Sequence, residues 1–222
     1  MRKHTWIIAE YWTIIRAHFV NTFIPYDPKH WTKGEKGDIV IVQGFNDKPT
    51  YLRKIADKLN SLGYRIHTIP ELKRQHAPVK YQAQLVADYL QRHNLSSYFF
   101  LAHSKGTIVT KYALDNCSIP LPRKVFALAP PFGGSVFGHL PLLNLHELKK
   151  GSEILKTLQA NKKNNHLFVT VYPEVDNMIL IPKSSHLEGA ENIQLSIKGH
   201  TIIMESDEMV QTIVDKIIAL DP

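Results

Sequence analysis

From Asp38 onward, short apolar runs alternate with helical patterns, and this alternation constrains the fold more than any other feature of the sequence. The apolar runs, such as Ile39-Val40-Ile41-Val42, are unbroken, whereas a strand with one wet face would alternate apolar and polar residues. Unbroken strands are typical of a parallel sheet that helices cover on both faces. The strands are predicted at residues 39–42, 64–69, 98–101, 124–128, 167–171 and 193–197. We therefore expect an α/β fold with a mostly parallel sheet of about six strands.

Helices are predicted between these strands from the 3.6-residue spacing of their apolar positions. They span residues 50–62, 79–90, 106–114, 152–158 and 209–220. Gly63 follows the first of them, where a glycine commonly ends a helix, and Ser206 precedes the last as an N-cap. Open parallel sheets place their sites at the carboxyl ends of the strands, so functional side chains are expected directly after the predicted strands.

The composition indicates one globular domain without covalent cross-links. The chain has 222 residues, of which 44% are hydrophobic and 21% charged, ordinary values for a folded domain. Its one cysteine, Cys117, excludes an internal disulfide and a thiolate zinc site. No zinc-binding histidine motif and no glycine-rich phosphate loop is present, so we expect neither a metal nor another cofactor.

The charge balance is basic. The net charge is +7, from 27 lysines and arginines against 20 acidic residues. Such an excess favours contact with anionic surfaces. The basic residues are spread along the chain without an arginine-rich arm, so we expect no nucleic-acid partner.

The first 24 residues form a separate feature ahead of the alternating pattern. Glu10 and Arg16 interrupt an apolar run, and no small-x-small cleavage site follows, which argues against a secretory signal and against a spanning helix. We therefore expect a cytoplasmic protein with an amphipathic helix and linker over residues 1–30 and an α/β domain over residues 31–222. The apolar face of this helix consists of Ile7, Ile8, Tyr11, Trp12, Ile14, Ile15, Phe19 and Phe23.

Two roles for this helix remain open. Tryptophans and nearby basic residues suit a helix that lies in the plane of an anionic membrane and associates the protein with it. An apolar face is equally typical of a helix that packs onto the core of its own domain. In both cases the proline-rich segment at residues 25–28 ends the helix.

A nucleophile is predicted after the third strand, in Ala102-His103-Ser104-Lys105-Gly106. This is a small-x-Ser-x-Gly pattern between a strand and a helix, which places the serine on a sharp, strained turn. Small residues two before and two after the serine let the strand and the helix approach closely. The start of the helix also offers backbone N–H groups to a developing negative charge.

These residues and four further stretches resemble the α/β-hydrolase superfamily, and within it the small bacterial lipases and esterases without a separate cap domain. The resemblance covers about residues 38–220. The further stretches are 43–45 after the first strand, 128–135 after the fourth, 176–182, and Gly199-His200.

The resemblance implies a Ser-His-Asp triad in the chain order serine, acid, histidine. Asp176 matches the family's Asp-x-x-x-x-x-Pro pattern, and His200 matches its Gly-His after the last strand. Ser104 would attack, His200 would take its proton, and Asp176 would orient the histidine. Glu174 is an alternative acid, whereas His186 precedes the last strand and is expected on the wrong side of it.

The resemblance also implies an oxyanion hole built from two backbone N–H groups, those of Phe45 and Lys105. Gly44 allows the loop after the first strand to bend close to a substrate. The family usually has histidine where this chain has Gln43, which puts the side-chain hydrogen bonding of that loop in doubt.

The segment from Ala129 to Leu148 is rich in leucine and phenylalanine and too short for a separate domain. It is predicted to border the pocket or to pack on the core. The expected substrate-binding residues are Gln43, Gly44, Phe132, Phe137, Leu140 and Leu142.

Together these patterns predict a serine hydrolase that cleaves carboxylic esters through an acyl-enzyme. An acyltransferase or thioesterase would use the same triad. A third interpretation is a non-catalytic module that binds a membrane or a partner through its first helix.

Overall fold

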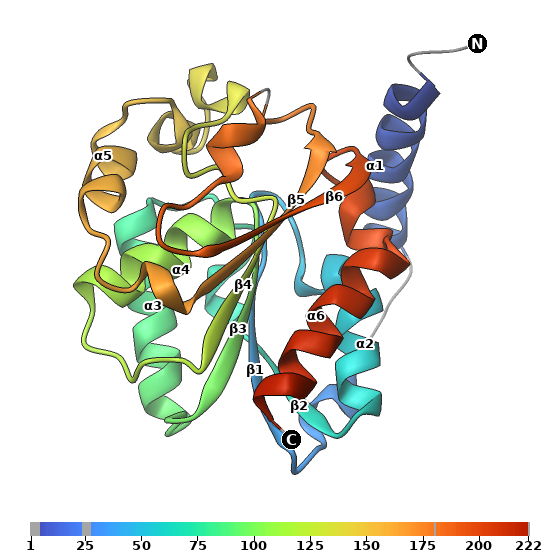
Figure 1. Ribbon diagram of the computed structural model, residues 1–222, viewed down its shortest axis with the longest axis vertical. Coiled ribbons are helices and arrows are strands. Elements are labelled where there is room, and N and C mark those ends of the chain that lie inside the picture. The colour runs from blue at the N-terminus through green and yellow to red at the C-terminus, as the bar shows by residue number, and fades with distance from the viewer. Residues whose placement is uncertain (1–4, 24–27, 180, 222) are drawn as a thin grey trace.

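The computed structural model describes residues 5–23, 28–179 and 181–221. A six-stranded sheet forms its centre, with strand order β2-β1-β3-β4-β5-β6, and every neighbouring pair of strands is parallel (Figure 1). These are the six strands that the sequence predicts, so the α/β class and the parallel sheet are confirmed. The strands are β1 (Gly37–Val42), β2 (Tyr64–Thr68), β3 (Tyr98–His103), β4 (Lys124–Leu128), β5 (Phe168–Val175) and β6 (Glu191–Lys198).

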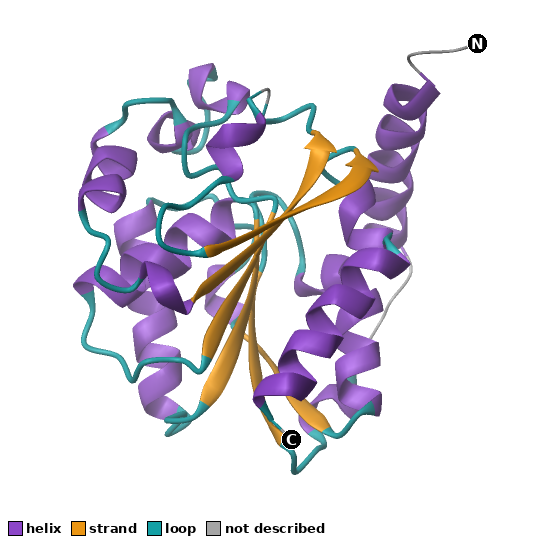
Figure 2. Ribbon diagram, in the orientation of Figure 1, coloured by secondary structure: helices purple, strands orange, loops and turns teal. Residues whose placement is uncertain are grey.

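Helices cover both faces of the sheet, as Figure 2 shows. Ser206 caps the last helix by accepting a hydrogen bond from the Met209 N–H, as expected. The helix predicted over residues 50–62 begins instead as a 3-10 turn at Pro49–Leu52. One face carries α2 (Arg53–Ser61) and α6 (Asp207–Leu220), and the other carries α3 (Val79–Arg92), α4 (Lys105–Asn116) and α5 (Glu153–Ala160).

The core is divided into two halves by the sheet. In β1, Ile39 and Ile41 pack in the half under α2 and α6, whereas Val40 and Val42 pack in the half under α3 and α4. Successive side chains of a strand point to opposite faces, so a sheet covered on both faces needs apolar residues at every position. This is why the central strands β1, β3 and β4 appear as unbroken apolar runs, whereas the edge strands β2 and β6 include polar residues.

The carboxyl ends of all six strands meet at one edge of the sheet, the upper edge in Figure 2. Ser104 follows β3 at this edge, Asp176 follows β5, and His200 follows β6. The parallel topology thus brings together three residues that are far apart in the sequence.

The first helix, α1 (Thr5–Phe23), lies at the outer edge of the molecule, against the 3-10 turns at Pro49–Leu52 and Ile202–Glu205 (Figure 1). The residues of its predicted apolar face divide between two sides of the helix: Ile7 and Ile14 are half-buried on the side of the completely buried Glu10, whereas the other six point outward. Residues 1–4 and the first three residues of the proline-rich segment 25–28, which was predicted to end the helix, lie outside the described residues. The division at residue 30 stays a prediction. The outward side chains, each at least 57% exposed, are Ile8, Tyr11, Trp12, Ile15, Phe19 and Phe23.

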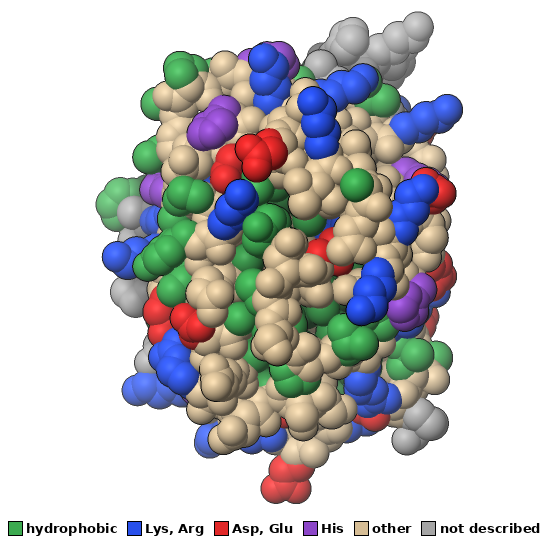
Figure 3. Space-filling model, turned by 90° about the vertical axis from the view of Figure 1, so that its left-hand side faces the viewer, with side chains coloured by type: hydrophobic (Ala, Val, Ile, Leu, Met, Phe, Trp, Pro, Cys, Tyr) green, Lys and Arg blue, Asp and Glu red, His purple; other side chains and the backbone are tan. Residues whose placement is uncertain are grey.

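Within the described ranges, no helix combines the length and hydropathy needed to cross a bilayer. Figure 3 shows the side of the molecule that lies to the left in Figure 1. There, lysine and arginine side chains are scattered among acidic and uncharged ones and do not gather in one patch.

Candidate active site

Ser104 occupies a strained turn between β3 and α4. Its backbone angles are φ 49° and ψ −123°, in a region that residues with side chains rarely adopt. The strain is held in place by close packing, because a Cβ at Gly106 would overlap the backbone carbonyl of Val42 and lie 2.5 Å from that of Gln43. The start of α4 therefore rests directly on the end of β1. The small residue expected two positions after the serine is sterically required.

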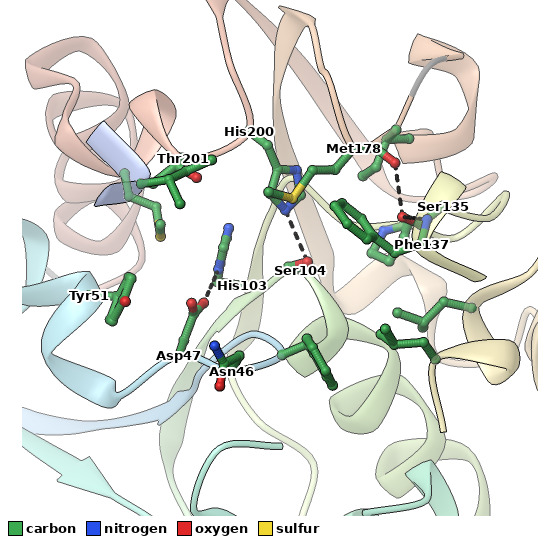
Figure 4. Close-up of a pocket in the computed structure, with 17 residues that line it drawn as sticks. Asn46, Asp47, Tyr51, His103, Ser104, Ser135, Phe137, Met178, His200 and Thr201 are labelled. Atoms are coloured by element: carbon green, nitrogen blue, oxygen red, sulfur yellow. Dashed lines mark hydrogen bonds and ion pairs between the residues drawn. The ribbon is translucent and has the colours of Figure 1, made fainter. Parts of the chain in front are cut away.

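A chain of two hydrogen bonds joins the three residues at the sheet edge. The Nε2 of His200 lies 3.0 Å from the Oγ of Ser104 (Figure 4). Its Nδ1 lies 2.7 Å from the Oδ2 of Asp176. An ionised carboxylate only accepts hydrogen bonds, so Nδ1 carries the proton in the neutral ring. The Nε2 atom is then free to accept the proton of the serine hydroxyl.

The Asp176 carboxylate is held firmly on its other side. Its Oδ1 accepts hydrogen bonds from the backbone N–H groups of Met178 and Ile179, each at 2.8 Å. Burial works to raise the pKa of Asp176, but the adjacent His200 and these N–H donors outweigh it, so the pKa is lowered. Asp176 therefore stays ionised and keeps orienting the histidine.

His200 lies among several carboxylates. Burial works to lower its pKa, but Asp176, with smaller contributions from Glu10 and Asp47, raises the pKa above the ordinary histidine value. The two alternative residues are not at the site. Glu174 is exposed at the end of β5, and His186 is exposed before β6.

Two backbone N–H groups border Ser104 from different elements. Lys105 begins α4, so its N–H has no acceptor within the helix. Its buried ammonium group donates to the carbonyls of Gln75 and Ala77, each at 2.8 Å, and burial lowers the pKa of Lys105 to about 8. The side chain is thus engaged away from the serine, and the backbone N–H remains beside it.

The loop after β1 approaches the serine closely. A Cβ at Gly44 would lie 2.9 Å from the Nδ1 of His103 and 3.2 Å from the Cβ of Ser104. Phe45, the next residue, lines the pocket at the serine. Phe45 and Lys105 therefore both lie next to Ser104, and the oxyanion hole that they would form stays a prediction.

A pocket of about 200 Å³ opens beside Ser104. Figure 4 shows Asp47 and His103 on one side of it and Phe137 and Met178 on the other. Its lining is mostly apolar and extends to α1 through Ile14. The remaining lining residues are Phe45, Asn46, Tyr51, Pro131, Ser135, Leu145, Leu148, Ile179, His200, Thr201 and Met204.

Of the six residues expected to bind substrate, only Phe137 is among those that line this pocket. Phe132 is buried in the core and packs edge-on against Phe168, because its side chain turns away from the site. Leu140 and Leu142 are 40% and 57% exposed on the outer surface near the pocket.

The other two residues expected to contact substrate, Gln43 and Gly44, belong to the loop after β1 and do not line the pocket. The amide of Gln43 is buried and donates a hydrogen bond to the Lys73 carbonyl at 2.9 Å. Gln43 therefore ties the loop after β1 to the neighbouring loop, in the position where the resemblance left the hydrogen bonding in doubt.

Two features of the site were not predicted. His103 and Asp47 form a buried pair, with Nδ1 and Oδ2 2.9 Å apart, and the two histidine rings at the site are 5.1 Å apart. Glu10 reaches the site from α1. The one signal for Glu10 was its position as an acidic residue inside an apolar run. In the part of the chain that the structure describes, no cluster of three or more metal-ligating side chains is present.

Comparison with known proteins identifies the fold. No protein-family model and no curated protein matches the sequence. A mature lipase of Bacillus licheniformis is 16% identical with a TM-score of 0.63, over 90% of this chain and 95% of that one. A carboxylesterase of the thaumarchaeon Nitrososphaera gargenis is 10% identical with a TM-score of 0.63, over 84% and 92%. An α/β-hydrolase from a lagoon-sediment metagenome is 14% identical with a TM-score of 0.60, over 86% and 94%.

These likenesses define the class: the chain has the α/β-hydrolase fold. In agreement with the sequence-based expectation, the described residues between β4 and β5 form short helical segments rather than a separate cap domain. At these sequence identities the comparisons show the fold, and they assign no role to any residue of this chain.

Proposed function

We propose that the protein is a serine hydrolase that cleaves carboxylic esters. The observation that carries this proposal is the hydrogen-bonded series Asp176–His200–Ser104 beside an apolar pocket. A serine hydroxyl needs an adjacent base to become nucleophilic, and a base needs a partner that fixes its tautomer. The two hydrogen bonds of His200 match both requirements, which supports the proposal.

In the proposed reaction, the Ser104 Oγ attacks the ester carbonyl as its proton moves to the Nε2 of His200. The N–H groups of Phe45 and Lys105 stabilise the oxyanion. The bond to the leaving alcohol breaks when His200 returns the proton to it. Water, activated by His200, then attacks the acyl-enzyme and releases the acid and the free serine.

The pocket supports esters with short acyl groups. Its volume of about 200 Å³ lies below the range of roughly 300–1,000 Å³ that is typical for drug-sized ligands. A longer acyl chain would extend over Phe137 and the exposed Leu140 and Leu142 near the pocket. Hydrolysis rates on p-nitrophenyl esters from acetate to palmitate measure this preference, and we expect a maximum among the shorter chains.

The primary test is labelling with a fluorophosphonate probe, with the labelled residue mapped by peptide mass spectrometry. We expect labelling at Ser104 that is lost in His200→Ala. Ser104→Ala should lower kcat by at least about 10³-fold in a folded protein. Near-normal ester hydrolysis by Ser104→Ala would end the assignment.

Acyl transfer and thioester cleavage use the same residues and remain alternatives. Product analysis separates them: an added alcohol that captures most of the acyl group indicates a transferase, and a large preference for acyl thioesters indicates a thioesterase. A non-catalytic binding module would give no serine labelling in any folded preparation.

We also propose that α1 contacts an anionic lipid surface. Trp12, Tyr11 and Phe19 are more than half exposed on its outer face, and aromatic side chains of this kind favour the membrane interface. The net charge of +7 complements an anionic surface.

The test of this contact compares the intact chain with an Ile8→Ser/Trp12→Ser/Ile15→Ser variant in co-sedimentation with vesicles. All three substitutions lie on the exposed side of α1 and leave Glu10 in place. We expect binding to vesicles rich in phosphatidylglycerol, weaker binding to phosphatidylcholine alone, and loss of binding in the variant. Equal binding by both proteins would contradict the proposal.

A further inference from the structure

Glu10 connects the first helix to the histidine at the site. Its carboxylate is completely buried, although it lies on a helix whose neighbouring side chains are largely exposed. Its Oε1 accepts a hydrogen bond from the Thr201 N–H at 2.7 Å, and its Oε2 accepts one from the Ile202 N–H at 3.0 Å. These are the two residues that directly follow His200.

The backbone before His200 is shaped around the same carboxylate. Gly199 has φ 122°, and a Cβ at this position would overlap the Oε2 of Glu10. The Gly199 N–H donates to the Val175 carbonyl at 2.8 Å, and the His200 N–H donates to the Asn177 side chain at 3.1 Å. The segment that carries the histidine is therefore held between the loop after β5 and Glu10.

We propose that Glu10 is a positioning residue that acts through His200. By accepting both N–H groups, its carboxylate fixes the loop that carries the histidine, and α1 is thereby part of the active site rather than an appended anchor. This inference rests on the proposed hydrolase function.

The burial of Glu10 has a clear physical cost. A buried carboxylate is strongly destabilising unless hydrogen bonds or charges compensate it, and hydrogen bonds from backbone N–H groups to a carboxylate are among the stronger ones. A surface helix that only needed to attach could do so through apolar contacts. α1 has such contacts available through the half-buried Ile7 and Ile14, and it nevertheless buries its acid completely, which favours a role for the acid at the loop.

Another contact links the docking of α1 to the pocket. Ile14, one turn after Glu10, is among the residues that line the pocket. If α1 moved away, the Glu10 carboxylate would leave the loop and one wall of the pocket would open.

The charge of Glu10 also acts on His200 directly. The charged and titratable groups that face the histidine are Asp176 from the end of β5, Asp47 from the loop after β1, His103 from β3 and Glu10 from α1. The negative charge of Glu10 helps to raise the pKa of His200. Removing that charge should lower the pKa, so the acid limb of the pH–rate profile should move to lower pH.

The experiment compares Glu10→Gln with Arg16→Gln as a matched control on the same helix. Arg16 contacts Glu205 at the surface and is not part of the site. For Glu10→Gln we expect kcat to fall about 10-fold or more with KM within about 3-fold, and the acid limb to shift to lower pH. For Arg16→Gln we expect neither change.

A second readout does not depend on activity. The imidazole of His200 can be titrated by NMR in histidine-labelled protein, with its signal identified by its absence in His200→Ala. We expect the midpoint of the His200 titration to fall in both Glu10→Gln and Glu10→Ala. The alanine variant is included because the side-chain amide of glutamine would still face the N–H groups of Thr201 and Ile202.

The outcomes separate this inference from the proposed function. Folded Glu10 variants with the wild-type kcat, acid limb and His200 titration would overturn the positioning role. A lower melting temperature without those changes would assign Glu10 to stability alone and also overturn it. Absence of fluorophosphonate labelling in the wild-type protein would instead reject the hydrolase proposal, whatever the titration shows.

Discussion

Replacing Asp176 by asparagine tests the hydrogen bond between the Oδ2 of Asp176 and the Nδ1 of His200. The carboxylate accepts three hydrogen bonds, from His200 at 2.7 Å and from Met178 and Ile179 at 2.8 Å each. An asparagine of the same shape has one acceptor oxygen and one NH₂ donor. It can satisfy either the two backbone donors or the histidine with that oxygen, but not both sides.

The energetic comparison decides which arrangement prevails. Turning the oxygen toward His200 leaves the N–H groups of Met178 and Ile179 buried and unpaired, at about 1–3 kcal/mol each. Turning the NH₂ group toward His200 leaves no unpaired donor, because the neutral imidazole can move its proton from Nδ1 to Nε2. The second arrangement is therefore favoured by about 2 kcal/mol or more.

In the favoured arrangement His200 presents an N–H to Ser104 and cannot take its proton. The charge that stabilises the imidazolium in the transition state is also lost. We expect Asp176→Asn to lower kcat/KM by about 10⁴-fold, which corresponds to about 5.4 kcal/mol of transition-state stabilisation.

The assay is hydrolysis of p-nitrophenyl butyrate, with folding verified by circular dichroism and thermal melting. Glu174→Gln is the matched control, because Glu174 is exposed two residues away and its substitution should leave kcat/KM within about twofold. An Asp176→Asn variant that retains activity within about 30-fold of the wild type would refute the tautomer argument.

Three further predictions address packing, pH dependence and a buried charge. Gly106→Ala should destabilise the fold by about 3 kcal/mol or more, because the new methyl group meets backbone carbonyls. Gly37→Ala is the control and should cost about 1 kcal/mol or less, because its new methyl group would lie 3.4 Å from the nearest side chain. Urea denaturation measures both free energies of unfolding, and equal costs would contradict the packing argument. Because His200 acts as a base only when neutral and its pKa is raised, kcat/KM should fall as the pH drops through a midpoint above about 6.5, and a midpoint below about 6 in the free enzyme would contradict the electrostatics. Lys111→Met should destabilise the fold by about 3–5 kcal/mol, since it leaves the buried carboxylate of Asp115 without its ammonium partner at 2.9 Å. Adding Asp115→Leu should recover part of this loss in urea denaturation, and no recovery would contradict a stabilising role for the ion pair.

The positions of Ser104, Asp176 and His200 at the sheet edge were predictable because each comes after a strand that the sequence predicts. A parallel sheet brings such positions to one edge whatever their separation along the chain. The strained turn at Ser104 was predictable for a related reason, since only a small residue at Gly106 allows α4 to start against β1.

The orientation of α1 was not predictable. Helical periodicity shows which side chains share a face, but it does not show which face meets the domain. The acceptance of two N–H groups by Glu10 is settled by Thr201 and Ile202, which lie 191 and 192 residues away. No local pattern contains that information.

The pocket wall was only partly predictable for a similar reason. The segment between β4 and β5 forms short 3-10 helices, at Val136–His139 and Leu145–Leu148, which are too brief to produce a periodic pattern. Without a period, the sequence could not distinguish Phe137, which lines the pocket, from Phe132, which turns into the core.

The hydrogen bond between Glu10 and Thr201 also sets an order of events during synthesis of the chain. The two residues are separated by 191 positions, so at about 5–20 residues per second the ribosome delivers the second partner on the order of 10–40 s after the first. Throughout that interval the loop that receives the carboxylate does not yet exist. The helix therefore waits for a partner that is made much later, and the site is complete only after both segments have emerged.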